Sequence, residues 1–377
     1  MSAKRAILFL SAALVFGAGV RLAAADPLLD AYQSVLADPT NSEVNLQYAL
    51  VAEGNKKYRL ALAAYERILA NDPNNKAALA GLQRVRRIIQ PASTLFTTEF
   101  GARFESNPLQ VATGAKDELF PYSKLHVRDE RNLFGTRWRT TADLWGEYHP
   151  VIGELSNANA FADTGPVIDV PGTQTAVHPA IGAAAGYFNG RFAYSEVNLS
   201  DLIEGYLDGA NQWARIRAGY RNYAPNFGST GGVYVGADGR LSRDHIFSES
   251  DVVSVTPWLL WSDIPGSVLD INSNHITPGR YIQGGAKFEY DRAVSSALTV
   301  GVFVGASERA FATDPADSGG HRQDFLVSPG MSLLFTNIFG IPQTDFRIDY
   351  QYDHNHSNAA ADSYDDHTVT LALVSRR

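Results

Sequence analysis

The sequence predicts a short all-α helical unit followed by an all-β antiparallel transmembrane barrel of about 14 strands. Three observations support this fold class. Asp-Pro pairs recur 34 residues apart, at Asp38 and Asp72, within an Ala/Leu-rich stretch. From residue 93 onward apolar and polar residues alternate, and the first 25 residues have the composition of an export signal. We therefore expect a signal peptide over 1–25, a periplasmic helical domain over 26–92 and an outer-membrane barrel over 93–377.

The N-terminal segment has the three parts of a secretory signal. Lys4 and Arg5 form a positive start, residues 6–19 are apolar, and the alanines at 23–25 offer small residues for cleavage. The apolar part is shorter than the roughly 20 residues that a membrane-spanning helix needs. We expect the signal to be removed and the mature chain to be exported.

Composition narrows the classes of protein that remain. The net charge is −8 and no long basic block occurs, which argues against nucleic acid as a partner, because a phosphate-binding surface needs excess Lys and Arg. Cysteine is absent, which excludes a disulfide framework and a thiolate metal site. The chain has 32 Gly, 17 Tyr and 19 Phe, a balance typical of aromatic-rich membrane strands.

The stretch from 26 to 90 has the spacing of packed helices. Apolar residues recur at intervals of three and four, and a proline after each stripe stops the helix. With a period of 34, and with Ala61, Tyr65 and Pro73 where that family has its small, aromatic and proline residues, the stretch resembles a tetratricopeptide repeat. Asn45 departs from it, because the family has a tryptophan there.

The stretch holds fewer than two full repeats, and each repeat depends on a neighbour to bury its apolar face. It must therefore pack against the barrel or a partner. Tyr48, Tyr58 and Tyr65 are the candidates for contact with cargo or a partner, and repeat core is the alternative role for each.

From residue 93 the hydrophobic period drops to two. Phe346, Ile348 and Tyr350, for example, alternate with Arg347 and Asp349. A water-soluble sandwich alternates as well, but strands of about ten residues behind an export signal favour a barrel in the outer membrane. The pattern gives 13 strand starts, near residues 94, 120, 136, 179, 191, 212, 232, 251, 280, 296, 324, 343 and 366.

Membrane barrels of bacteria have an even strand count, short turns on the periplasmic side and longer loops outside. Short turns at 129–132 and 188–191 are expected inside, as are 291–296 and 337–342, with external loops at 149–177, 311–322 and 354–366. Counts from the two ends disagree by one strand between Tyr223 and Arg280. We expect the missing strand there, either by a split near 237–239 or within 268–276.

Residues 101–108, which read GARFESNP, resemble the opening of barrels that follow tetratricopeptide units in bacterial exporters. Together with a barrel of about 14 strands, this makes the chain similar to the surface lipoprotein assembly modulators. The resemblance implies a barrel that moves proteins to the cell surface. Polysaccharide exporters share the plan but usually carry more repeats and a larger barrel.

The polar face of the strands is expected to line the lumen. It mixes charges of both signs, which predicts either an ion-pair network that supports the wall or a selectivity lining for an anionic polymer or acidic chain. Trp145 and Trp213 share that face and could stack on sugars. The candidate lumen residues are Arg137, Arg139, Asp143, Glu147, Arg215, Arg217, Arg221, Glu289, Arg347 and Asp349.

Catalytic and metal signals are weak. The chain lacks Gly-x-Ser-x-Gly and a phosphate-binding loop, so we expect no catalytic residue and no cofactor. His354, His356 and the acidic residues after them could hold a divalent ion, but solvated side chains are the more frequent outcome in such loops, and no metal site is expected.

Three functions remain open. The first is export, in which the barrel moves a protein or polymer cargo to the cell surface and the helices dock cargo or a partner in the periplasm. The second is surface display or anchoring by external loops, and the third is an outer-membrane enzyme. We favour export, with exopolysaccharide export as a further alternative, and with outer-membrane lipid as the surrounding partner.

Overall fold

The computed structural model describes residues 27–72, 75–89, 92–133, 136–170, 173, 175–207, 210–227, 230–265, 279–341 and 343–377. The predicted signal peptide over 1–25 lies outside these residues. By its internal contacts the chain divides between Val85 and Arg86 into a helical unit and a barrel unit, a few residues before the expected break after residue 92. No helix within the described ranges is both long and apolar enough to span a membrane.

The helical unit is built from successive short helices whose ends are set by polar side chains. Asn41 caps one helix by accepting hydrogen bonds from the backbone N–H groups of Glu43 and Val44, at 3.0 and 3.2 Å. Asn75 accepts one from the N–H of Ala78 at 3.0 Å in the same way. The helices are α1 (Pro27–Ala37), α2 (Ser42–Gly54), α3 (Tyr58–Asn71) and α4 (Lys76–Ile89).

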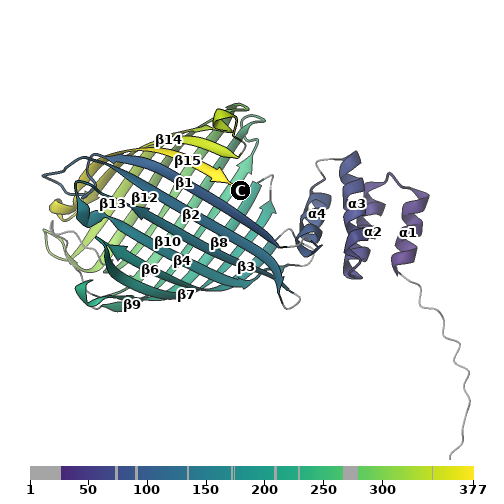
Figure 1. Cartoon of the computed structure of the whole chain (residues 1–377), viewed down its shortest axis with the longest axis horizontal. Helices are drawn as coiled ribbons and strands as arrows, with labels where there is room; N and C mark the ends of the chain where they lie inside the picture. Colours follow the sequence, from purple (N-terminus) through teal and green to yellow (C-terminus); the bar gives the residue numbers. More distant parts are fainter. Residues whose placement is uncertain are drawn as a thin grey trace, which may run out of the picture. The chain divides into compact units, whose positions relative to one another are not determined.

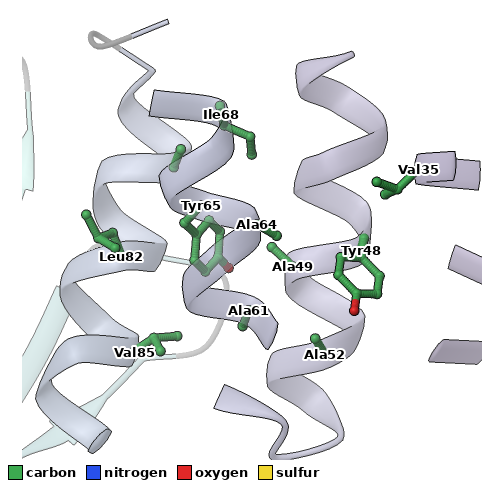
Figure 2. Packing of buried hydrophobic residues seen from close by; sticks show 11 residues of the cluster. Val35, Tyr48, Ala49, Ala52, Ala61, Ala64, Tyr65, Ile68, Leu82 and Val85 are labelled. Atoms are coloured by element: carbon green, nitrogen blue, oxygen red, sulfur yellow. The ribbon is translucent and has the colours of Figure 1, made fainter. Parts of the chain in front are cut away.

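Small residues let these helices pack closely. Ala49, Ala61 and Ala64 are completely or almost completely buried, and Tyr65 is buried with them between α3 and α4 (Figure 2). Gly81 on α4 provides the room for that ring, because a Cβ atom there would lie 2.1 Å from the ring carbon Cζ of Tyr65. The helical unit therefore has a core of its own.

The barrel unit is one antiparallel sheet that closes on itself (Figure 1). Within the described ranges fourteen long strands form the ring, and the two-residue strand β5 pairs with β6. Pairing of β1 with β15 and of β4 with β6 completes it. The strands are β1 (Ser93–Glu105), β2 (Glu118–Leu133), β3 (Thr136–Glu147), β4 (Asn157–Pro166), β5 (Ile168–Asp169), β6 (Thr175–Phe188), β7 (Arg191–Leu207), β8 (Ala210–Tyr223), β9 (Gly231–Asp244), β10 (Asp251–Asp263), β11 (Arg280–Ser295), β12 (Leu298–Pro315), β13 (His321–Phe335), β14 (Thr344–Ser357) and β15 (Tyr364–Arg376).

The predicted fold class is confirmed, but the strand that the sequence count lacked lies elsewhere. It is β4, which falls inside the segment 149–177 that was expected to be an external loop. β9 runs without a break through 237–239, and 268–276 lies outside the described residues. β4 escaped detection because its lipid-facing positions are only Ala158, Ala160 and Ala162, which give little apolar contrast.

The ends of the barrel also differ from the expected turns. We call the end where β1 begins proximal and the end where β1 finishes distal. β2 continues through 129–132 to Leu133, so no turn occurs there. The turn at 188–191 is distal, since the N–H of Asn189 donates to the carbonyl of Ser156, just before β4, at 2.7 Å. The extra strand β4 reverses the direction of the chain and so moves this turn to the other end.

Candidate functional site in the barrel interior

The two faces of the barrel wall differ in character. Residues directly opposite on neighbouring strands share a face, so the register assigns every strand residue to one side or the other. One face carries large exposed apolar side chains, such as Phe100, Leu119 and Leu199, each more than 60% exposed. The other carries the charged residues and lines the cavities inside the barrel.

The register places all ten candidate lumen residues on this inward face. Most of them have an oppositely charged partner. Arg103 pairs with Glu147 at 3.1 Å, and Arg347 pairs with Glu99 on β1 at 3.0 Å. The other pairs are Asp143 with His126 at 2.7 Å, Arg347 with Asp349 at 2.6 Å, and Glu289 with Lys287 at 2.8 Å and Arg240 at 3.2 Å.

A buried ionic cluster spans part of the lumen near the proximal end. Arg139 on β3 is only 2% exposed and contacts Glu130 on β2 at 2.8 Å and Glu204 on β7 at 2.5 Å. β4 and β6 lie between β3 and β7, so the Arg139 side chain passes across them. Gly165 on β4, opposite Arg139, has no side chain to obstruct it. Arg137 joins the cluster through Glu130 at 3.1 Å.

This Arg139 cluster narrows the interior on one side without filling the barrel. A cavity of about 740 Å³ lies along β1 and β11 to β15, and its acidic lining includes Glu289, Asp291 and Asp353. A second cavity, of about 590 Å³, lies between Arg103, Asp143 and Arg217. The interior therefore holds open, charged space above a constriction of paired side chains.

The distal end is held by a buried histidine. His149 follows β3, stacks on Phe120 with ring centroids 3.9 Å apart, and contacts Glu118 through Nδ1 at 2.9 Å. Glu118 also accepts hydrogen bonds from the N–H groups of Val151 and Ile152. Burial opposes the charged imidazolium, but hydrogen bonds to Glu147 and Glu118 outweigh it and raise the pKa of His149 above 6.5.

The structure does not favour two of the three tyrosines proposed for cargo contact. Tyr65 is fully buried, and its hydroxyl donates to Glu53 at 2.9 Å; burial, followed by the charge of Glu53, raises the Tyr65 pKa. Tyr48 is 6% exposed, and burial raises its pKa as well. Neither can contact a cargo while the core is intact, because the core needs these rings for packing. Tyr58, at the start of α3, is half-buried against the same core.

Several interior residues were not singled out from the sequence. Glu130, Glu196, Glu204 and Asp238 neutralise the predicted arginines, and the alternation already places all four on the inward face. The available signal was therefore their parity. Their pairings follow from strand register, which the sequence pattern does not define.

The potential metal ligands of the distal end are not clustered. His354 pairs with Asp365 at 2.8 Å on an exposed part of β14 and β15. Within the ranges that the structure describes, no group of three or more His, Asp or Glu side chains is arranged to hold a metal ion.

No protein-family model matches the sequence, and no curated protein matches it. The resemblance to tetratricopeptide repeats and to the assembly modulators therefore stays a prediction. Among solved structures, the chain is similar to the outer membrane channel DcaP of Acinetobacter baumannii, with 9% identity and a TM-score of 0.43 over 77% of this chain and 98% of that chain.

Two further solved structures are similar to this chain. One is a bacterial polysaccharide outer membrane secretin, with 10% identity and a TM-score of 0.41 over 75% of this chain and 98% of that one. The other is the outer membrane protein OpdK from Pseudomonas aeruginosa, with 8% identity and a TM-score of 0.34 over 76% and 99%. These similarities concern the fold alone.

Proposed function

We propose that this chain is an outer-membrane transport barrel that moves a protein or polymer cargo to the cell surface, with its helical unit docking cargo or a partner in the periplasm. One observation carries the proposal: the wall is apolar outside, whereas its charged inner face surrounds open cavities. An apolar outer wall requires lipid, and in a closed barrel every strand is paired on both sides. Open charged space inside such a wall suits the passage of polar cargo.

Surface display is the weaker candidate on this structure. Display was expected to use a long ordered loop over 149–177, but β4 occupies the middle of that segment. The remaining connection over 148–156 is tied down by Glu118. Little chain is left at that position to form a binding surface outside the barrel.

Polysaccharide export is supported by the inward aromatic residues. Trp145, Trp213 and Trp258 each line a cavity on the inward side of β3, β8 and β10. Flat aromatic rings beside charged groups are suited to stack on sugars and bind their polar substituents. The polymer form of the cargo therefore stays in the proposal beside the protein form.

Docking by the helical unit needs an exposed apolar surface. The face of α1 formed by Leu29, Tyr32 and Leu36 meets this need, with exposed fractions of 53, 42 and 61%. The core residue Val35 lies on the opposite side of the helix. This α1 face is therefore a better docking candidate than Tyr48 or Tyr65.

The test is deletion of residues 26–90 with the signal retained. We expect the barrel to insert, as judged by its heat-dependent mobility in SDS gels, while surface cargo falls sharply. Surface proteins are measured by labelling with a membrane-impermeant biotin reagent, and released polymer by total sugar. A matched variant, Leu29→Ser with Leu36→Ser, keeps the helices and should reproduce the loss. Normal surface levels in the deletion strain would refute the docking role.

A further inference from the structure

Three arginines on the inward face of β8 face different surroundings. Arg215 is directly opposite Asp238 on β9, and its guanidinium contacts that carboxylate at 2.7 and 3.0 Å. Arg221 is directly opposite Glu196 on β7 and contacts it at 2.7 Å. In both cases the register places a carboxylate on the neighbouring strand beside the arginine, so the charge is neutralised within the wall.

Arg217, between them, has no such partner. It is directly opposite Ser200 on β7 and Gly236 on β9, neither of which carries a charge. Its Nε atom is buried without a hydrogen-bond partner, and no carboxylate in the described part of the chain forms an ion pair with it. The guanidinium lies over the ring of Phe161 on β4, 4.7 Å from the ring centroid. A partly desolvated donor without an acceptor is costly unless an anion binds there.

Open space adjoins this guanidinium on both sides. Arg217 lines the 590 Å³ cavity and also a cavity of about 320 Å³ toward β9, β10 and β11. Gly236 leaves the second cavity unfilled beside it, and three aromatic side chains, Tyr234, Trp258 and Tyr281, line the rest. The smaller cavity has room for one ring-sized molecule, with its charge toward Arg217.

The other charges of this cavity do not oppose an anion. Asp238 is held by Arg215, and Arg221 is held by Glu196, so each of these pairs is close to neutral. The unpaired charge that remains is the guanidinium of Arg217. Guanidinium groups bind carboxylates through two parallel hydrogen bonds, which combine charge with directional recognition.

We propose that Arg217 binds the carboxylate of a ring-bearing organic anion, whose ring lies among Tyr234, Trp258 and Tyr281. The anion is a free aromatic acid or a uronate sugar, which share a ring that carries a carboxylate. The site goes beyond the transport function proposed above, and requires only that the barrel folds with this interior.

The test is equilibrium binding to the purified, detergent-solubilised full-length protein at pH 7.5, by isothermal titration with sodium benzoate and with sodium glucuronate. Benzyl alcohol and glucose serve as uncharged counterparts. Arg217→Gln should weaken binding of the acid about tenfold or more, as expected for loss of hydrogen bonds to a charged group. Arg217→Lys should retain part of the affinity. Arg131→Gln removes an exposed arginine whose partner is Asp129, outside this site, and should change nothing.

Binding of benzoate alone assigns the site to free aromatic acids, and binding of glucuronate assigns it to acidic sugars. Failure of both acids to bind at 50 mM, or equal affinity of the wild type and Arg217→Gln, overturns the proposal. So does binding of the uncharged counterparts as tightly as the acids. Each variant is first shown to be folded by its heat-dependent gel mobility. Because binding is measured without transport, its outcome is independent of the deletion experiment on residues 26–90.

Discussion

Replacing Arg84 by methionine tests how the helical unit is held together. Arg84 on α4 reaches Glu53 on α2 through two contacts of 2.5 and 2.7 Å, and Tyr65 donates to the same carboxylate. The side chains of Arg84 and Glu53 are 13 and 15% exposed, so the ion pair is largely withdrawn from water. The change leaves Glu53 charged, nearly buried and held by Tyr65 alone.

The magnitude follows from this geometry. Breaking a fully buried pair on one side destabilises by about 3–5 kcal/mol, and the residual exposure of both groups reduces this to about 2 kcal/mol. At 1.4 kcal/mol for each factor of ten, local opening of the helices should become about 30 times more frequent. Hydrogen exchange read by mass spectrometry would show the amides of α2 and α3 exchanging faster by that factor, with the barrel strands unchanged.

The control is Arg59→Met, which removes an exposed arginine from α3. It should leave exchange of α2 and α3 within about a factor of two, because exposed charges contribute little. An exchange rate in Arg84→Met within threefold of the wild type would refute the reasoning that this ion pair holds α4 against α2. Faster exchange in both variants would instead point to a general loss of helix stability.

Two further predictions concern the barrel. Arg139→Met removes the side chain that links Glu130 to Glu204 across part of the lumen, and should raise single-channel conductance in planar bilayers by about twofold; unchanged conductance would show that the constriction lies elsewhere. The raised pKa of His149 means that its stabilising charge is fully present below pH 6.5 and is lost as pH rises through the folded-state value. Protease cleavage within 148–156 should therefore increase from pH 6 to pH 9 in the wild type, and a pH-independent rate in the wild type, or the same pH dependence in His149→Gln, would contradict this.

The sequence pattern was sufficient to predict which residues face the lumen but not how they pair. Alternation assigns Arg139 and Arg217 to the inward face, because the side-chain period of a strand is two. It carries no information on register, so it could not show that one arginine meets two carboxylates and the other meets serine and glycine. The difference between a structural charge and a binding candidate lies entirely in that register.

β4 shows where the pattern itself fails. Its lipid-facing residues are alanines, whereas its largest apolar side chain, Phe161, points inward beneath Arg217. The usual rule that the apolar face meets lipid is therefore weak on one face and reversed on the other. A count based on apolar contrast passes over such a strand, and every later turn is then assigned to the wrong end until a second error compensates.

The pairing of β1 with β15 has a consequence for biogenesis. Phe100 is directly opposite Leu373, so the seam joins segments from nearly opposite ends of the chain. Contacts between such distant segments form slowly, and until they form, both edge strands expose unpaired amides that attract other chains. Yield in the cell should therefore depend on how long a holding chaperone shields the two edges before the bilayer receives them.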